Sequence, residues 1–490
     1  MWISYGEGDN NLNNFNEFNI SEYILTAIDK LGFKNPSKVQ IEVIPRALLG
    51  KDLIVKAQTG SGKTAAFGIP ICEKINLEER KPQALVLTPT RELCVQVKED
   101  ISNLGRLKRV KCTAIFGKQP YEAQVTSLKQ RTHVIVGTPG RTLDHIERGT
   151  LDLSEIKYLI IDEADEMLKL GFIEQVEAII DKVSDDRITM LFSATIPEEV
   201  EAICKKYMKE PEIVEIPSSK ITADNIKHIY YEIDETRKFD LLLDIFYAEN
   251  TKSGIIFCST KDRVGNITSR LKKHGIPCEA LHGGMLQNDR LAVINAFRRG
   301  EFMFLITTDV AARGIDIQEI THIINYDVPM EKERYVHRTG RTARAGEKGA
   351  AITLVSHNEY RFFDAVEQYI GFKIEKKSLP SMEEIELSKE AFLNSIKAKP
   401  KLKKSKSANL NVDITKIYLG AGKKKKIRSM DIVGTITSIE GITAEDIGII
   451  DIQDNISYVD ILNGKGLIVI DALKHKKIKG KTVKVQKAEK

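Results

Sequence analysis

The stretch DLIVKAQTGSGKTAAFGIP, residues 52–70, decides the fold. It places a glycine-rich turn between a run of apolar, β-branched residues and a segment that can form a helix. The backbone N–H groups of such a turn, with the helix N-terminus behind them, form a cradle for phosphate oxygens. In this pattern Lys63 reaches the β- and γ-phosphates and Thr64 places its hydroxyl on Mg²⁺. The stretch therefore predicts an α/β domain that binds a nucleoside triphosphate, the alternative being a glycine-rich loop with an incidental lysine.

Two further motifs suit phosphate chemistry. In YLIIDEAD (158–165), Asp162 closes an apolar strand and is predicted to hold the same Mg²⁺, while Glu163 is placed to orient or deprotonate the attacking water. In HRTGRTAR (337–344), three arginines recur every third residue, a spacing that can stabilise charge on a transferring phosphoryl group. The alternatives are a solvated acidic turn and a solvated basic helix face.

Two similar halves precede a different C-terminal region. In each half, short runs such as ALVLTP (84–89) and SGIIFCST (253–260) alternate with longer amphipathic segments. This alternation predicts parallel sheets buried on both faces, in two doubly wound α/β domains that join near residue 216. Residues 379–411 read as a charged linker whose first part can form a helix, and residues 412–490 predict a small domain with the order β-α-β-β-α-β.

The amino-acid composition of the chain limits the kinds of partner that it can bind. The chain has 490 residues and a formal net charge of +5. Residues 397–490 carry 21 Lys and Arg against 10 Asp and Glu, whereas the preceding part carries 53 against 59. A basic region on a mildly acidic body points to a polyanion, most simply nucleic acid, with a solvated tail as the alternative. The six cysteines show no C-x-x-C pair, and no apolar run is long enough to span a membrane, so we expect a cytoplasmic protein.

Together these motifs resemble the DEAD-box RNA helicases of superfamily 2, over about residues 15–375. The matching segments are Phe15 with GFKNPSKVQ (32–40) for the Q motif, AQTGSGKT (57–64), PTREL (89–93), TPGR (138–141), DEAD (162–165), SAT (193–195), IIFCST (255–260), TTDVAARGID (307–316) and HRTGRTAR (337–344). The resemblance implies two tandem RecA-like domains, residues 1–215 and 216–378, which bind ATP and Mg²⁺ and hydrolyse ATP when RNA is bound.

The resemblance also implies roles for individual residues. Lys63, Asp162, Glu163, Arg341 and Arg344 would be catalytic, with the last two as arginine fingers, and Thr64 and Asp162 would hold Mg²⁺. The ATP site would comprise Phe15, Gln40, Ala57, Gln58, Thr59, Gly60, Ser61, Gly62, Lys63, Thr64 and Asp316. Ser193 and Thr195 would couple hydrolysis to domain movement. The RNA path would run through Arg91, Gly117, Thr138, Arg141, Arg290, Thr308 and Arg313. The family's Gly-Gly turn is Gly117-Lys118 here, and Ala343 stands where Gly is common.

The C-terminal region resembles an RRM, a ferredoxin-like domain that stacks bases on aromatic residues of its sheet. Tyr418 and Tyr458 occupy its first and third strands, but the other stacking positions are depleted, so both could equally be packing residues. The region is similar to that of the bacterial DbpA/YxiN branch, which implies an address in large-subunit ribosomal RNA. We therefore predict that Lys423, Lys424, Lys425, Lys426 and Arg428 contact RNA phosphates.

The sequence as a whole predicts an ATP-dependent RNA helicase that acts as a monomer on a 23S rRNA hairpin in pre-50S ribosomal particles. Alternatives within the class are a general helicase or RNA chaperone of cold response or mRNA decay. Alternatives outside it are a passive RNA clamp with a degenerate ATPase and, more weakly, a DNA translocase.

Overall fold

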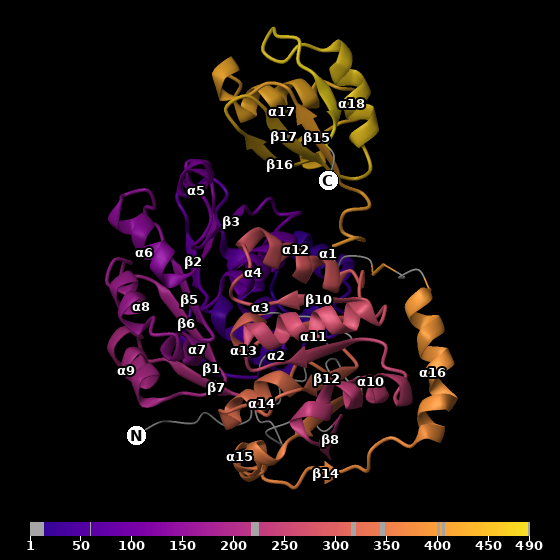
Figure 1. Ribbon diagram of the computed structural model, residues 1–490. Coiled ribbons are helices and arrows are strands. Elements are labelled where there is room, and N and C mark those ends of the chain that lie inside the picture. The colour runs from indigo at the N-terminus through magenta and orange to yellow at the C-terminus, as the bar shows by residue number, and fades with distance from the viewer. Residues whose placement is uncertain are drawn as a thin grey trace. The chain divides into compact units, whose positions relative to one another are not determined.

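The computed structural model describes residues 14–58, 60–216, 225–314, 320–343, 348–398, 402–403 and 407–488. The chain divides into two compact units, one formed by Met1–Ile216 with Ser405–Lys490 and the other by Pro217–Lys404 (Figure 1). The first unit contains a large parallel sheet and, separately, a small antiparallel one, and the second unit contains a single large parallel sheet. No helix within the described ranges is long and apolar enough to cross a membrane.

The parallel sheet of the first unit has seven strands in the order β3-β4-β2-β5-β6-β1-β7. Successive strand residues pack into different cores: Val55 and Val86 lie in one, Ile54 and Leu85 in the other. Both faces of the sheet are therefore covered, as the apolar runs predicted. The strands are β1 (Leu53–Lys56), β2 (Ala84–Leu87), β3 (Cys112–Ile115), β4 (Val134–Gly137), β5 (Tyr158–Asp162), β6 (Ile188–Ser193) and β7 (Glu212–Glu215).

Nine α-helices surround this sheet within the described residues. Those on one face include α3, whose Phe67 packs against Phe192 of β6, and those on the other include α8, whose Val176 and Ile179 are buried. The helices are α1 (Glu22–Lys30), α2 (Lys38–Leu48), α3 (Lys63–Lys74), α4 (Arg91–Leu104), α5 (Tyr121–Leu128), α6 (Pro139–Glu147), α7 (Ala164–Lys169), α8 (Ile173–Ile180) and α9 (Glu198–Tyr207).

The second unit repeats this design with the strand order β10-β11-β9-β12-β13-β8-β14, all parallel. Its strands are β8 (Ile226–Glu232), β9 (Gly254–Phe257), β10 (Cys278–Leu281), β11 (Phe304–Thr307), β12 (His322–Asn325), β13 (Gly349–Val355) and β14 (Glu375–Lys376). Its helices are α10 (Lys238–Ala248), α11 (Lys261–Lys273), α12 (Gln287–Arg298), α13 (Asp309–Ala312), α14 (Lys332–Thr339), α15 (Tyr360–Ile370) and α16 (Met382–Lys397). The predicted pair of doubly wound parallel sheets is confirmed.

Helix α16 corrects the prediction of a charged linker over residues 379–411. Ser381 caps its N-terminus by accepting from the amide of Glu384, and Phe392 is fully buried against Phe246 and Tyr247 of α10. The first part of the expected linker is therefore a packed element of the second unit. The many charges of α16 lie on the exposed face of an amphipathic helix. The amino-acid composition of the segment alone therefore resembles that of a linker.

The small domain has four antiparallel strands in the order β16-β17-β15-β18, with two helices on one face. Alternate strand residues, including Ile417 and Val459, pack under both helices. The elements are β15 (Thr415–Leu419), α17 (Ser429–Thr437), β16 (Ile447–Ile452), β17 (Ser457–Ile461), α18 (Gly466–His475) and β18 (Val485–Lys487). This is the predicted β-α-β-β-α-β order.

The packing of α16 gives a stability prediction. Replacing Phe392 by Ala leaves a cavity against α10, so we expect Phe392→Ala to lower the free energy of unfolding of the second unit by about 3–5 kcal/mol. Leu387→Ala is the matched control, because Leu387 lies on the same helix and is 83% exposed; its effect should stay within about 0.5 kcal/mol. Urea unfolding of both variants measures the difference, and equal stabilities would contradict the assigned packing.

Candidate active site

The glycine-rich turn connects β1 to α3 and leaves the helix N-terminus open. Gly60 and Gly62 adopt φ values of +84° and +96°, a region that other residues enter only with strain. Lys63 is the first residue of α3, and its buried Nζ donates to the Ala57 carbonyl oxygen at 3.3 Å. The ammonium group is thus held at the turn, where a phosphate would meet it together with the helix dipole. Thr59 lies outside the described residues.

Helix α2 braces this turn through two side chains. Gln40 Nε2 donates to the Gly62 carbonyl oxygen at 3.2 Å, and Ser37 Oγ donates to the Ser61 carbonyl oxygen at 2.8 Å. Gln40 Oε1 accepts from the Ser37 amide, so the two residues also form the capping box of α2. Our sequence reasoning missed Ser37, although Ser-x-x-Gln before an apolar run is the signal of a capping box. Phe15 is buried edge-to-face against Phe18 and Phe33.

Asp162 is the last residue of β5, and its side chain fits a metal ion. Its Oδ1 atom is buried and has no hydrogen-bond partner in the part of the chain that the structure describes. Burial raises the pKa of Asp162, and the nearby charge of Lys63 opposes that shift. A carboxylate oxygen of this kind is a ligand that Mg²⁺ prefers, and Thr64, the second residue of α3, supplies a hydroxyl. The residues present therefore fit Mg²⁺, which when bound would neutralise charge on the phosphates.

Glu163 follows in a strained conformation. Its φ and ψ are both 54°, in the left-handed region that costs a residue with a side chain about 1–3 kcal/mol. The strain turns the chain sharply from β5 into α7, so that Asp162 and Glu163 follow one another at the carboxyl end of the strand. Such outliers concentrate at active sites, which agrees with the predicted role of Glu163.

A hydrogen-bond chain links this turn to the end of β6. The Asp165 amide donates to Ser193 Oγ at 3.1 Å, and Thr195 donates from its amide and hydroxyl to Asp165 Oδ2 at 3.2 and 3.1 Å. The Ala57 amide donates to the Ser193 carbonyl oxygen at 3.0 Å. The predicted coupling residues Ser193 and Thr195 thus touch both the DEAD turn and the start of the phosphate turn. Asp165, to which our sequence reasoning gave no role, joins them.

The predicted RNA contacts of the first unit cluster where three adjacent strands end. Arg91 follows β2, Gly117 follows β3, and Thr138 and Arg141 follow β4. A Cβ atom on Gly117 would lie 3.6 Å from Arg91 Nη2. Arg141 Nη1 donates to the Gln119 carbonyl oxygen at 3.2 Å, and this bond holds the guanidinium group beside the turn after β3.

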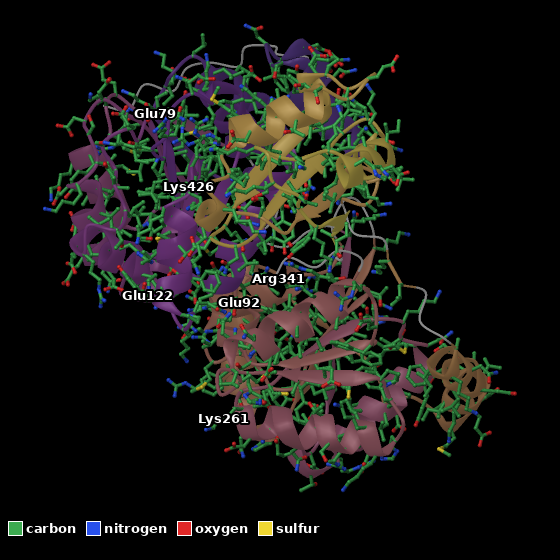
Figure 2. All side chains as sticks on the ribbon, turned by 90° about the horizontal axis from the view of Figure 1, so that it is seen from above. Glu79, Glu92, Glu122, Lys261, Arg341 and Lys426 are labelled. Atoms are coloured by element: carbon green, nitrogen blue, oxygen red, sulfur yellow. The ribbon has the colours of Figure 1, made fainter. Side chains whose placement is uncertain are left out.

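In the second unit, three predicted RNA contacts surround α13. Thr308 is its N-cap, Arg313 is its C-cap, and Arg290 of α12 donates to the Ala311 carbonyl oxygen at 3.4 Å. Arg341 follows α14, and its amide donates to the Arg338 carbonyl oxygen at 3.1 Å (Figure 2). Asp316 and Arg344 lie outside the described residues.

The four lysines of the small domain form a structured turn. Residues 423–425 make one turn of 3-10 helix, and the amides of Lys423 and Lys424 donate to the carbonyl oxygens of Gln453 and Asp454 at 2.9 and 2.8 Å. A Cβ atom on Gly422 would overlap the Gln453 carbonyl oxygen, so only glycine allows this approach. All four lysines and Arg428 are exposed, and Lys426 ends the turn with a φ of +58° (Figure 2).

Tyr418 and Tyr458 form a cross-strand pair of β15 and β17 on the sheet face away from the two helices. Their rings meet edge-on, with centroids 5.9 Å apart. Each ring therefore has a packing partner within the sheet.

Comparisons with known proteins agree with this geometry. The DEAD/DEAH box helicase family matches residues 37–203, the helicase conserved C-terminal domain matches residues 237–346, and the DbpA RNA binding domain matches residues 416–487. The solved structure of Dbp5 from S. cerevisiae, bound to RNA and ADP BeF3, superposes with a TM-score of 0.69 and 32% identity, covering 78% of this chain and all of that one.

This chain belongs to the DEAD-box family of ATP-dependent RNA helicases. It is 56% identical to the ATP-dependent RNA helicase DbpA of Bacillus subtilis over 98% of this chain and the whole of that protein. It is also 44% identical to the helicase CshA of Geobacillus kaustophilus, over 76% of this chain and 79% of that protein. The predicted class, an RNA-dependent ATPase with a C-terminal RNA-binding domain, is confirmed.

The turn gives a binding prediction. A side chain at Gly62 would require the left-handed backbone, at about 1–2 kcal/mol, and would lie 2.6 Å from Gln40 Nε2 and 2.9 Å from Ser37 Oγ. We expect Gly62→Ala to weaken ATP binding by about tenfold or more, measured by fluorescent-nucleotide titration. Gly265→Ala is the control, because nothing lies within 4 Å of a Cβ atom there. Unchanged affinity in Gly62→Ala would contradict the described turn.

Proposed function

We propose that this helicase is directed by its C-terminal domain to a 23S rRNA hairpin, and that it remodels RNA there during assembly of the large ribosomal subunit. The observation that carries the proposal is the structured turn Lys423–Lys426, which presents five exposed cations with Arg428 on a domain matched by the DbpA RNA binding domain. Lysines contact phosphates without reading sequence, so the fixed shape of the turn would supply specificity.

In the same proposal, Lys63 and Thr64 hold the phosphates and Mg²⁺ together with Asp162, and Gln40 reads adenine. A glutamine amide carries two N–H groups and a carbonyl oxygen with two lone pairs, so Gln40 can brace Gly62 and still pair with a base. Glu163 orients or deprotonates the attacking water, and Arg341 stabilises the charge of the transferring phosphoryl group. A monomeric, cytoplasmic enzyme and pre-50S particles as its substrate belong to the proposal as well.

The role of Glu163 predicts a separation of binding from turnover. Glu163→Gln keeps the size and hydrogen bonding of the side chain but removes its basicity. We expect ATP and RNA binding to persist while kcat falls by about 10²–10⁴-fold. Steady-state ATPase assays and nucleotide titrations measure the two effects, with Glu174→Gln on α8 as a matched control. Wild-type turnover in Glu163→Gln would remove Glu163 from this role.

The proposed binding to 23S rRNA predicts that different nucleic acids stimulate the ATPase to different extents. We expect strong ATPase stimulation by 23S rRNA that contains the hairpin, and weak stimulation by rRNA lacking it, by poly(A) and by DNA. Alanine at Lys423, Lys424, Lys425, Lys426 and Arg428 should reduce hairpin affinity and flatten its dependence on salt, since about one counterion is released for each phosphate contact. The control replaces five exposed lysines elsewhere, Lys129, Lys182, Lys209, Lys252 and Lys273, which gives the same net charge.

The outcomes separate the alternatives. Equal stimulation by poly(A) would indicate a general helicase or chaperone, and RNA binding without stimulated turnover would indicate a passive clamp. Stimulation by DNA alone would indicate a DNA translocase. Equal losses of hairpin affinity in the five-residue variant and its control would show that net charge, rather than the turn, determines binding.

A further inference from the structure

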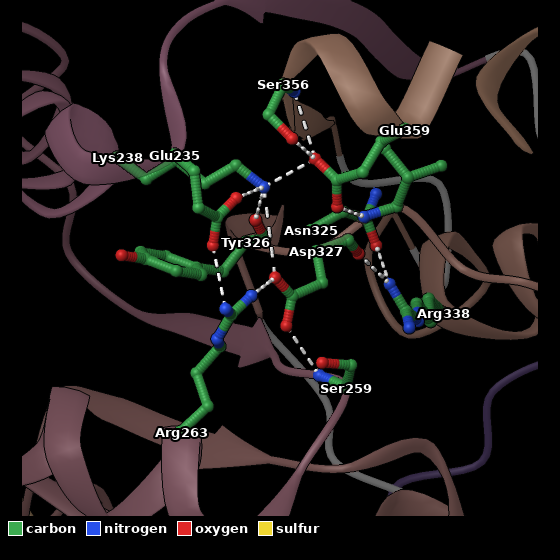
Figure 3. Close-up of polar contacts among 11 residues, drawn as sticks. Glu235, Lys238, Ser259, Arg263, Asn325, Tyr326, Asp327, Arg338, Ser356 and Glu359 are labelled. Atoms are coloured by element: carbon green, nitrogen blue, oxygen red, sulfur yellow. Dashed lines mark hydrogen bonds and ion pairs between the residues drawn. The ribbon is translucent and has the colours of Figure 1, made fainter. Parts of the chain in front are cut away.

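A network of charges, buried at Lys238, Asp327 and Arg338, runs across the second unit at the carboxyl ends of five neighbouring strands, β11, β9, β12, β13 and β8. Figure 3 shows the part around Lys238 and Asp327. Each strand is followed by at least one member. The members are Asp309 after β11, Ser259 after β9, Asn325, Tyr326 and Asp327 at β12, Ser356 and Glu359 after β13, and Glu235 and Lys238 after β8. Arg263 of α11 and Arg338 of α14 complete it.

The centre of the network is the turn that follows β12. Lys238 Nζ donates to the Tyr326 carbonyl oxygen at 2.9 Å, and Glu359 Oε1 accepts from the Val328 amide at 3.0 Å. Asp327 Oδ2 accepts from the Ser259 amide at 2.6 Å, and its other oxygen binds Arg263. Three consecutive residues are therefore each held by a different contact.

This turn leads into α14, whose Arg338 binds back to it. Arg338 Nη1 donates to the Asp327 carbonyl oxygen at 2.8 Å. Its Nε and Nη2 donate to the two carboxylate oxygens of Asp309 at 2.6 and 2.8 Å. Arg338 thereby ties α14 both to the turn and to α13. Because the Arg341 amide donates to the Arg338 carbonyl oxygen, the position of Arg341 depends on this assembly.

Lys238 and Glu359 hold the turn after β12 from the side opposite Arg338 by binding the backbone of Tyr326 and Val328. Neither residue lies in a segment that resembles a helicase motif. The Lys238 side chain is fully buried, and Nζ lies 2.6 Å from Glu359 Oε2 and 3.1 Å from Glu235 Oε2. Glu359 Oε2 also accepts from the Ser356 amide and hydroxyl at 2.9 and 2.7 Å. A buried ion pair contributes little net stability compared with apolar residues of the same size. What such a pair does provide here is a fixed position for the Tyr326–Val328 backbone.

We propose that Lys238 and Glu359 are positioning residues for RNA-stimulated ATP hydrolysis, which hold the turn after β12 so that α14 presents Arg341 in its reactive place. The inference rests on the proposed role of Arg341. Neither residue touches the nucleotide in this scheme; both act on kcat through the backbone that carries Arg341.

The test uses the full-length chain with saturating 23S rRNA. In Lys238→Met the Tyr326 carbonyl oxygen loses its donor. In Glu359→Gln the Lys238 ammonium loses its nearest carboxylate, at 2.6 Å, and keeps Glu235 at 3.1 Å. We expect kcat to fall by about 10–100-fold in each variant, because small displacements of a reacting group have effects of this size. The KM for ATP should change little, since the contacts of the phosphate turn remain intact.

The double variant Lys238→Met, Glu359→Gln separates positioning from stability. Removing both charges avoids the Glu359 carboxylate that Lys238→Met leaves without its cation, so the melting temperature of the double variant should recover toward that of the wild type relative to Lys238→Met. The Tyr326 carbonyl oxygen still lacks its donor, and kcat should therefore stay low. Recovery of kcat together with melting temperature would overturn the proposal, because both residues would then act on stability alone.

Two controls complete the design. Lys272→Met with Glu279→Gln removes an ion pair of the same unit, 2.8 Å long and exposed, and should leave kcat unchanged. Arg341→Ala should lower kcat at least as far as Lys238→Met does. Wild-type kcat in Arg341→Ala would remove the proposed role of Arg341, whereas a loss in Arg341→Ala with wild-type kcat in both Lys238→Met and Glu359→Gln would overturn the positioning role alone.

Discussion

The parallel arrangement of the strands is the constraint on which the chemistry depends, because it brings every carboxyl end to one edge of its sheet. In the first unit, β5, β6 and β1 are neighbours, and their ends deliver Asp162, Ser193 and the phosphate turn to adjacent positions. At the same edge, β3, β4 and β2 deliver the residues predicted to bind RNA. The predicted nucleotide and RNA sites therefore lie at the edge of one sheet, which would offer a physical route for each ligand to influence the other.

The second unit uses the same edge in a different way. In the first unit a buried carboxylate oxygen of Asp162 has no hydrogen-bond partner among the described residues, which suits a ligand of an external cation. In the second unit the carboxylates at the strand ends are bound by the protein's own cations; bonds from Arg338 and Arg334 hold the pKa of Asp309 below its ordinary value despite burial. At the strand ends of the first unit, Asp162 is thus placed to bind a ligand. At the strand ends of the second unit, Asp309 and Asp327 instead fix the protein's own backbone.

Much of the fold could be predicted from sequence, because short apolar runs and glycine-rich turns form from residues that are close together in the chain. The turn before Lys63, the position of the DEAD segment at the end of a strand and the β-α-β-β-α-β order are of this kind. The network around Lys238 could not be predicted, since Lys238 and Glu359 are separated by 121 residues and each resembles an ordinary surface charge. The packing of α16 could not be predicted either, because Ile385 and Phe392 are two buried residues among many exposed charges.

The packing of α16 also affects which truncated fragments of this helicase keep a covered core. A fragment ending at residue 378, where the resemblance to the helicase motifs stops, would lack the helix that covers Phe246 and Tyr247. Those aromatic rings would then be exposed to water and form an apolar patch that promotes aggregation. We therefore expect a fragment to keep this part of the core covered only when it extends through α16.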